Sequence, residues 1–207
     1  LHNLQHIGKI VPQEVLPILG IENPYFYRNK MEFSFSNKRW LSSEEIAKES
    51  KIERNGLGFH KPGMWDKIVD VNKCHLQADP SNEIRNSIKA FAIEKGMSFF
   101  DSRAQEGFLR TLMIRNTLAG EVMVLIQFFE ERKEDIELLL SFIKTRFSKV
   151  TSLLYCINSK GNDSLYDQEI RCFSGNEYIT ERLGDLQFRI TAKSFYQTNP
   201  KQASVLY

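Results

Sequence analysis

Residues 108–128, with the sequence FLRTLMIRNTLAGEVMVLIQF, decide the fold class. Two apolar segments, 108–115 and 121–128, have the length of strands. The connection between them, Asn116-Thr117-Leu118-Ala119-Gly120, is typical of a tight antiparallel turn. The preceding segment 97–100 is also apolar and strand-sized. We therefore predict a three-stranded antiparallel meander built from 97–100, 108–115 and 121–128.

Helical periodicity flanks this meander on both sides. Asp79-Pro80-Ser81 gives a cap-like start to a predicted helix that ends at Gly96, and residues 131–147 form a second helix with an acidic first turn. Both carry one apolar face at helical spacing. These faces consist of Ile84, Ile88, Phe91 and Ala92 in the first helix and Ile136, Leu139, Leu140, Ile143 and Phe147 in the second.

More strands are predicted before and after the helices. Residues 30–35 alternate polar and apolar side chains, and the segments 58–60 and 67–71 flank the turn Lys61-Pro62-Gly63 as a hairpin. Strand-sized segments after the second helix are 150–157, 169–173, 177–181 and 187–191. The order predicts an α+β fold with a mostly antiparallel β-sheet and flanking helices.

A dinucleotide-binding fold is disfavoured. Gly56-Leu57-Gly58 opens a strand rather than a helix, and no further glycine follows at the spacing that cradles a phosphate. The long polar segment 36–58 is instead predicted to be an exposed excursion between two strands, rich in charged residues such as Lys48, Glu49 and Lys51.

Composition excludes several classes of protein. With 28 Lys+Arg and 26 Asp+Glu among 207 residues, the formal net charge is +2, which argues against strong global affinity for nucleic acid. The longest aliphatic run, 122–126, is far short of the roughly 20 apolar residues that span a bilayer. Cys74, Cys156 and Cys172 form no C-x-x-C pair, so neither a disulfide framework nor a self-contained zinc site is indicated. We expect a monomeric cytoplasmic protein without membrane contact.

Basic and aromatic residues are interleaved near the N-terminal strand. Arg28, Lys30, Lys38 and Arg39 lie among Tyr25, Phe26, Tyr27, Phe33, Phe35 and Trp40, a pattern that suits phosphates and unpaired bases. The pattern alone favours the alternative, an ordinary sheet surface. Arg110 and Arg115 have an odd spacing, which predicts opposite faces of a regular strand.

Two other positions have alternative interpretations. In the polar segment 194–199, either Gln197 and Asn199 cap a helix, which the pattern favours, or Gln197 holds a polar ligand while Phe195 stacks on a flat one. Cys74 is either a metal or cluster ligand or, as its isolation favours, a buried inert thiol.

Motifs in a fixed order give a more specific interpretation. They are 27–35 (YRNKMEFSF), 58–60 (GFH), 68–74 (IVDVNKC), Leu109-Arg110, Ile114-Arg115, Gly120-Glu121, Phe188 and 194–199 (SFYQTN). In this order they resemble the RNA uracil-5-methyltransferase family, which makes 5-methyluridine in ribosomal and transfer RNA with S-adenosylmethionine. The resemblance runs from Tyr25 to Tyr207 and favours the branch that acts on 23S ribosomal RNA.

The resemblance implies a domain organisation. Residues 1–192 would be the central RNA-recognition domain of a larger S-adenosylmethionine-dependent methyltransferase, and 193–207 the start of the connection to a C-terminal Rossmann-like catalytic domain. In this family a cysteine adds to uracil C6 and a carboxylate base then removes the C5 proton. None of the three cysteines matches the nucleophile's motif, so we assign no catalytic residue and expect residues 1–207 alone to be inactive.

The resemblance also implies site residues. Gln197 matches a glutamine that binds S-adenosylmethionine, and Phe195 an aromatic residue close to the target base. Arg28, Lys30 and Phe59 match RNA-facing positions. Cys74 matches the fourth ligand of a [4Fe-4S] cluster found in one branch, whose other three cysteines are absent from this sequence.

Two alternatives remain open. A stand-alone RNA-binding module without enzyme activity would keep the RNA surface alone. A structural iron–sulfur protein would keep the cluster, with the RNA surface incidental.

Overall fold

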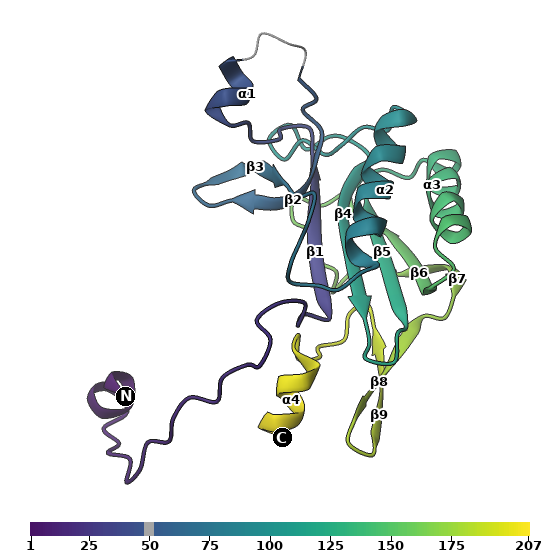
Figure 1. The fold of residues 1–207 in the computed structure, drawn as a ribbon. Helices are drawn as coiled ribbons and strands as arrows, with labels where there is room; N and C mark the ends of the chain where they lie inside the picture. The colour runs from purple at the N-terminus through teal and green to yellow at the C-terminus, as the bar shows by residue number, and fades with distance from the viewer. Residues whose placement is uncertain (48–51) are drawn as a thin grey trace.

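The computed structural model describes residues 1–47 and 52–207 and consists of a seven-stranded sheet, a separate two-stranded ribbon and flanking helices (Figure 1). The strands are β1 Lys30–Ser36, β2 Gly56–Lys61, β3 Met64–Asp70, β4 Leu109–Asn116, β5 Val122–Phe128, β6 Val150–Ile157, β7 Arg171–Gly175, β8 Tyr178–Leu183 and β9 Leu186–Thr191. The helices are the π-helical turn η1 Asn3–Ile7, α1 Ser43–Ala47, α2 Ser81–Glu94, α3 Lys133–Arg146 and α4 Pro200–Leu206.

The large sheet has the strand order β3-β2-β1-β4-β5-β6-β7. All neighbours pair antiparallel except β5 and β6, which are parallel and connected through α3. The predicted α+β class with a mostly antiparallel sheet is confirmed. β5 and β6 are parallel because α3 returns the chain to the end of the sheet at which β5 began. A tight turn can connect only antiparallel strands.

The predicted three-stranded meander is wrong in one strand. β4 and β5 pair as expected, but residues 97–100 form no strand, and Phe99 makes only an isolated bridge to Leu109. The physical reason is that β1 pairs with β4 from Thr111 to Arg115, so only the Leu109 end of that edge is left for residues 98–100.

Helices α2 and α3 cover one face of the sheet and close the main core. The apolar side chains predicted for these helices pack against Phe33, Leu112 and Val124 of the sheet. The two helices also touch each other, because the rings of Phe91 and Phe142 stack with centroids 4.0 Å apart. Apolar burial on this scale is the main stabilising contribution to the fold.

The opposite face is called the open face below. On β1 it carries the polar residues Lys30, Glu32, Ser34 and Ser36, which alternate with the core residues Met31, Phe33 and Phe35. The β8–β9 ribbon covers the part of this face over β4 to β6. There Ile179, Ile190 and Ala192 pack on Met113, Met123, Leu125 and Leu154 as a second core.

Gly58 lets β3 approach β2 closely. A Cβ atom at this position would lie 2.0 Å from the carbonyl oxygen of Val69. The Gly-x-Gly pattern at 56–58 therefore serves strand packing, as expected for a glycine inside a strand.

The predicted excursion at 36–58 is partly ordered by the sheet. Arg39 bridges to Ile68, and the Trp40 amide donates to the Ile68 carbonyl oxygen at 2.8 Å. α1 follows, and the charged residues Lys48, Glu49 and Lys51 lie outside the described residues.

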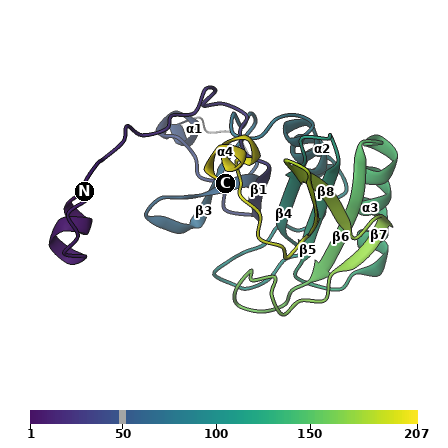
Figure 2. The ribbon, with the colours of Figure 1, turned by 90° about the horizontal axis from the view of Figure 1, so that it is seen from below.

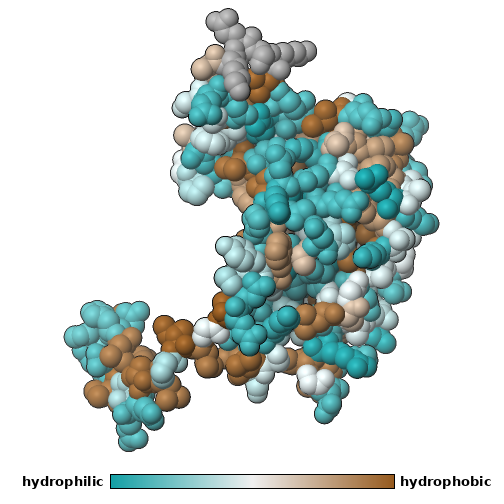
Figure 3. Space-filling view, viewed as in Figure 1, coloured by the Kyte–Doolittle hydropathy of each residue, from teal (hydrophilic) through white to brown (hydrophobic). Residues whose placement is uncertain are grey.

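The N-terminal segment extends away from the sheet (Figures 1 and 2). Its apolar side chains, including Ile7, Val11 and Ile18, are exposed, and Figure 3 shows brown apolar residues among teal hydrophilic ones along this arm. No helix in the described chain is both long and apolar enough to cross a membrane.

Candidate functional site

The lower half of β1 has a free edge. Among the described residues, β1 pairs with β2 only through Ser34, Phe35 and Ser36, so Lys30–Phe33 have no partner strand on that side. A cavity of about 500 Å³ lies at this edge and is bordered by Arg28, Lys30, Phe59 and Thr198. Three residues predicted to face RNA thus line one cavity, which we call the edge groove.

The cations of the edge groove are only weakly engaged. Lys30 forms an ion pair of 2.5 Å with Glu32, with side-chain exposures of 31% and 49%. Arg28 donates from Nε to the Lys30 carbonyl oxygen at 3.4 Å, a long hydrogen bond. A solvent-accessible ion pair contributes about 0–1 kcal/mol, and the Arg28 hydrogen bond is long, so neither contact holds its cation strongly.

Phe59, which was predicted to face RNA, has less of its ring accessible than this role would need. Its ring packs on Phe33 with centroids 5.2 Å apart and is partly buried against the main core. It therefore forms an apolar wall of the groove.

A second cavity continues from the edge groove on the open face. It has a volume of about 290 Å³, shares Lys30 and Glu32 with the groove, and is bordered further by Arg115 and Phe195. We call it the Phe195 cavity. Phe195 is 86% exposed, so nearly all of its ring is available for stacking.

Arg115 is a buried cation at this cavity that the sequence did not single out as a site residue. It donates to the Ser194 carbonyl oxygen at 2.6 Å, and its Nε is buried without a partner in the described chain. Burial lowers the pKa of Arg115, while the negative charge of Glu32 opposes that shift. The guanidinium fixes the backbone just before Phe195.

The opposite orientation predicted for Arg110 and Arg115 is wrong. Both border cavities of the open face, because the pairing of β4 with β5 has a register shift between Leu109 and Thr111. A bulge of this kind breaks the strict alternation on which the prediction rested.

The segment carrying Phe195 and Gln197 is anchored to the start of β1. Asn29 donates from its backbone N–H to the Thr198 carbonyl oxygen at 2.8 Å and from Nδ2 to the Gln197 carbonyl oxygen at 3.0 Å. Asn29 and Thr198 were not predicted as site residues, since only the tertiary structure brings them together.

Gln197 is not a helix cap. Asn199 caps α4, with Oδ1 accepting from the Gln202 N–H at 3.1 Å, and Pro200 occupies the first helical position. The Gln197 side chain instead donates to the Tyr207 hydroxyl at 3.2 Å beside a cavity of about 350 Å³. Gln197 borders this cavity, and Thr198 borders both this cavity and the edge groove.

Cys74 lies apart from these cavities. Its side chain is 5% exposed in the main core, and its backbone N–H donates to Asn82 Oδ1 at 2.7 Å. Over residues 1–47 and 52–207 no group of three or more His, Cys, Asp or Glu side chains is arranged to hold a metal ion. The residues present therefore do not fit an iron–sulfur cluster.

Comparison with known proteins identifies related chains. An uncharacterized RNA methyltransferase of Porphyromonas gingivalis is 50% identical over 210 residues, which span 99% of this chain and 45% of the relative. Another from Bacteroides thetaiotaomicron is 46% identical over 209 residues, 99% of this chain and 46% of the relative. No family model matches the sequence.

A solved structure gives the same class. The crystal structure of Pyrococcus abyssi tRNA (uracil-54, C5)-methyltransferase in complex with S-adenosyl-L-homocysteine superposes with a TM-score of 0.66 and 28% identity. The match covers 89% of this chain and 40% of that one. The chain is therefore homologous to RNA methyltransferases, and it spans less than half the length of these relatives.

Proposed function

We propose that this chain is the RNA-recognition part of an S-adenosylmethionine-dependent methyltransferase that makes 5-methyluridine, with 23S ribosomal RNA as the substrate. The observation that supports it most is the continuity of the site. The edge groove leads through Lys30 and Glu32 into the Phe195 cavity, and Gln197 follows on the same anchored segment. The cations proposed to face RNA, an exposed ring and the Gln197 amide are thus connected through neighbouring cavities and one anchored segment.

Each part of this surface has a distinct task. Arg28 and Lys30 bind phosphates and set the position of the RNA strand. Phe195 offers a stacking surface to a base that has left the helix, which is required because uracil C5 and C6 cannot be reached inside a stack. The buried Arg115 holds the backbone of this segment in place through Ser194.

Gln197 is the proposed cofactor contact. Its side-chain amide both donates and accepts, so it can bind the polar groups of S-adenosylmethionine while Asn29 fixes its backbone. When bound, the cofactor supplies the methyl group. Residues 193–207 form the proposed connection to a catalytic domain, which would contain the cysteine that adds to uracil C6.

The test is methyl transfer from labelled S-adenosylmethionine to unmodified 23S ribosomal RNA. The full-length gene product should label the RNA at uridine C5, whereas residues 1–207 alone should bind RNA without labelling it. Binding by the full-length protein without any transfer would instead identify a stand-alone RNA-binding module. Labelling of transfer RNA but not 23S RNA would overturn the proposed substrate and keep the reaction.

A further inference from the structure

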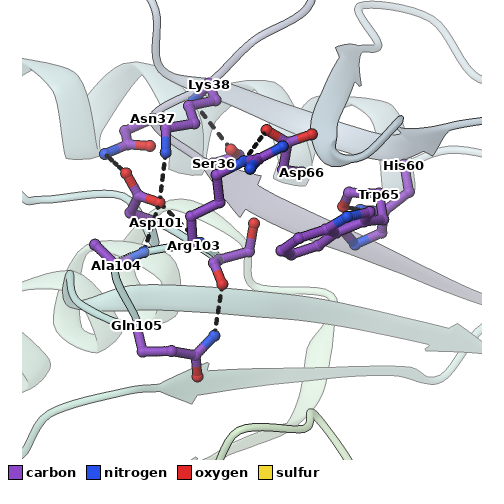
Figure 4. Close-up of polar contacts among 11 residues, drawn as sticks. Ser36, Asn37, Lys38, His60, Trp65, Asp66, Asp101, Arg103, Ala104 and Gln105 are labelled. Carbon is purple, nitrogen blue, oxygen red and sulfur yellow. Dashed lines mark hydrogen bonds and ion pairs between the residues drawn. The ribbon is translucent and has the colours of Figure 1, made fainter. Parts of the chain in front are cut away.

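The upper end of the open face carries a third cavity, which none of the proposed RNA-binding or cofactor-binding residues borders. It has a volume of about 170 Å³ and is bordered by Trp65, His60 and Asp66 of the β2–β3 hairpin, by Ser34 and Ser36 of β1, and by Arg110. We call it the Trp65 cavity; Figure 4 shows the polar side chains around it.

Trp65 is an exposed aromatic residue held in a defined environment. It is 61% exposed, although a large apolar ring is normally buried. His60 donates from Nδ1 to the Trp65 carbonyl oxygen at 2.7 Å, which leaves Nε2 to accept from the Ser34 hydroxyl at 3.2 Å. The hairpin is thus fixed to β1 directly beside the indole ring.

Asp66 borders the cavity, and Arg103, which lies beside it, contacts both Trp65 and Asp66. The Arg103 guanidinium carbon lies 5.3 Å from the centre of the Trp65 ring, and its Nε donates to Asp66 Oδ2 at 2.6 Å. This hydrogen bond lowers the pKa of Asp66 against the opposing effect of burial. An exposed flat ring, a guanidinium plane beside it and an ionised, largely buried carboxylate thus lie together at one small site.

Hydrogen bonds to Asp101 already order the loop that carries Arg103 when no ligand is present. Asp101 accepts from Lys38 Nζ at 2.8 Å, from the Arg103 N–H at 2.9 Å and from the Ala104 N–H at 3.1 Å (Figure 4). A site whose side chains are already ordered loses little entropy when a ligand binds.

The floor of the cavity is a buried cation. Arg110 is 4% exposed and donates to the carbonyl oxygens of Asn158 and Lys160 at 2.7 and 2.6 Å. Its guanidinium carbon lies 4.8 Å from the Phe100 ring centre. The carbonyl groups leave Arg110 charged, and the carboxylate of Asp163, which also borders the Trp65 cavity, is the anion that interacts with it.

The Trp65 cavity is continuous with the proposed RNA surface. Ser34 and Ser36 follow Lys30 and Glu32 on the same face of β1. Asp163 borders both this cavity and the Phe195 cavity. A strand of RNA that follows the open face from the edge groove therefore passes directly in front of Trp65.

We propose that the Trp65 cavity binds an unpaired nucleobase of the RNA, separate from the target base, by stacking it on Trp65 and Arg103. Aromatic rings and guanidinium planes are the groups on which proteins stack splayed-out bases, and Asp66 accepts a base N–H. This inference rests on the proposed function, because it takes RNA as the ligand. It adds a contact that would help select the substrate.

The test compares Trp65→Ala with the unaltered full-length protein. The probes are a mixed-sequence single-stranded RNA 12-mer and a 12-mer of abasic sugar phosphates of equal charge. Stacking predicts that Trp65→Ala weakens binding of the RNA roughly 5- to 150-fold and leaves binding of the abasic probe unchanged. Trp65→Phe should retain most of the affinity. Leu138→Ala, an exposed apolar position on α3, is the control and should change neither.

Each outcome decides the inference. Unchanged RNA affinity in Trp65→Ala, or equal loss for both probes, would overturn the base-binding role while methyl transfer by the unaltered protein still supported the proposed function. If the unaltered protein neither bound RNA nor transferred methyl groups, the proposed function would fail and this inference with it. Thermal unfolding of Trp65→Ala, expected within a few degrees of the unaltered protein, excludes a folding defect as the cause.

Discussion

The side-chain amide of Asn29 donates a hydrogen bond of 3.0 Å to the backbone carbonyl oxygen of Gln197, 168 positions later in the chain. Together with the bond from the Asn29 N–H to Thr198, it joins the start of β1 to the proposed cofactor contact. The edge groove and Gln197 therefore hold fixed positions relative to each other.

Removing this anchor should destabilise the fold. Asn29→Ala leaves a partly buried carbonyl oxygen without its donor, so the free energy of unfolding should fall by about 1–3 kcal/mol. Urea denaturation measures the loss. Asn23→Ala, at an exposed asparagine that accepts only from the Tyr25 N–H, is the control and should change stability by less than about 0.5 kcal/mol. Equal effects of the two substitutions would contradict an anchoring role.

Substitutions of Gln197 and Asn199 should have different effects, the first on cofactor binding and the second on stability. Gln197→Ala should weaken S-adenosylmethionine binding by the full-length protein about tenfold, the value of one lost hydrogen bond, without changing RNA affinity. Asn199→Ala removes the cap of α4 and should cost about 1 kcal/mol of stability. Calorimetric titration and thermal melting distinguish them. A Gln197→Ala variant that lost cofactor and RNA binding equally would indicate a structural role for Gln197.

Arg28 should contribute to RNA affinity through its positive charge. Arg28→Ala should weaken RNA binding and reduce the slope of log affinity against log salt by about 0.7–0.9, the release of counterions from one phosphate. The measurement is a titration of labelled RNA over a range of salt concentrations. Lys95→Ala, an exposed cation after α2 on the helix-covered side, should leave the slope unchanged. An unaltered slope in Arg28→Ala would argue against a phosphate contact.

The Asp101 network should make stability depend on pH. Hydrogen bonds from Lys38 and from backbone N–H groups lower the pKa of Asp101 below its ordinary value of 3.8, although burial opposes them. Its stabilising contribution is therefore complete above about pH 5 and is lost as the pH falls through the unfolded-state pKa toward the lower folded-state pKa. Asp101→Asn should be about 1–3 kcal/mol less stable at pH 6, and this deficit should shrink by pH 3. Denaturation at both pH values checks it, and a constant deficit would contradict the assignment.

Local sequence patterns predicted most of the elements. The alternation in residues 30–35 and the spacing of apolar residues in both long helices gave β1, α2 and α3, because these features depend on residues close in sequence. The pairing of strands, in contrast, does not depend on residues close in sequence. The parallel pair β5–β6 depends on the path of the chain through α3, and the missing strand at 97–100 depends on the pairing of β1 with β4. No local pattern records either.

The residues of the candidate site were predicted only in part. The resemblance pointed to Arg28, Lys30 and Phe59, and the structure places all three at one cavity. Asn29 and Arg115 lie in motifs that carry the resemblance, but no site role was predicted for them, because their partners lie far away in the sequence. Trp65 was missed because a single aromatic residue in a hairpin carries no signal until its exposure and its neighbours are known.

Strand β1 also sets the distance between the edge groove and the Trp65 cavity. Lys30 borders the edge groove and Ser36 borders the Trp65 cavity, and the backbone between them is an extended strand paired with β4 from Lys30 to Ser34. At about 3.3 Å per residue the two ends are roughly 20 Å apart. Because backbone pairing sets this interval, an RNA that occupied both cavities would need a fixed number of nucleotides between its contacts, and loops of other lengths would fit only one of them.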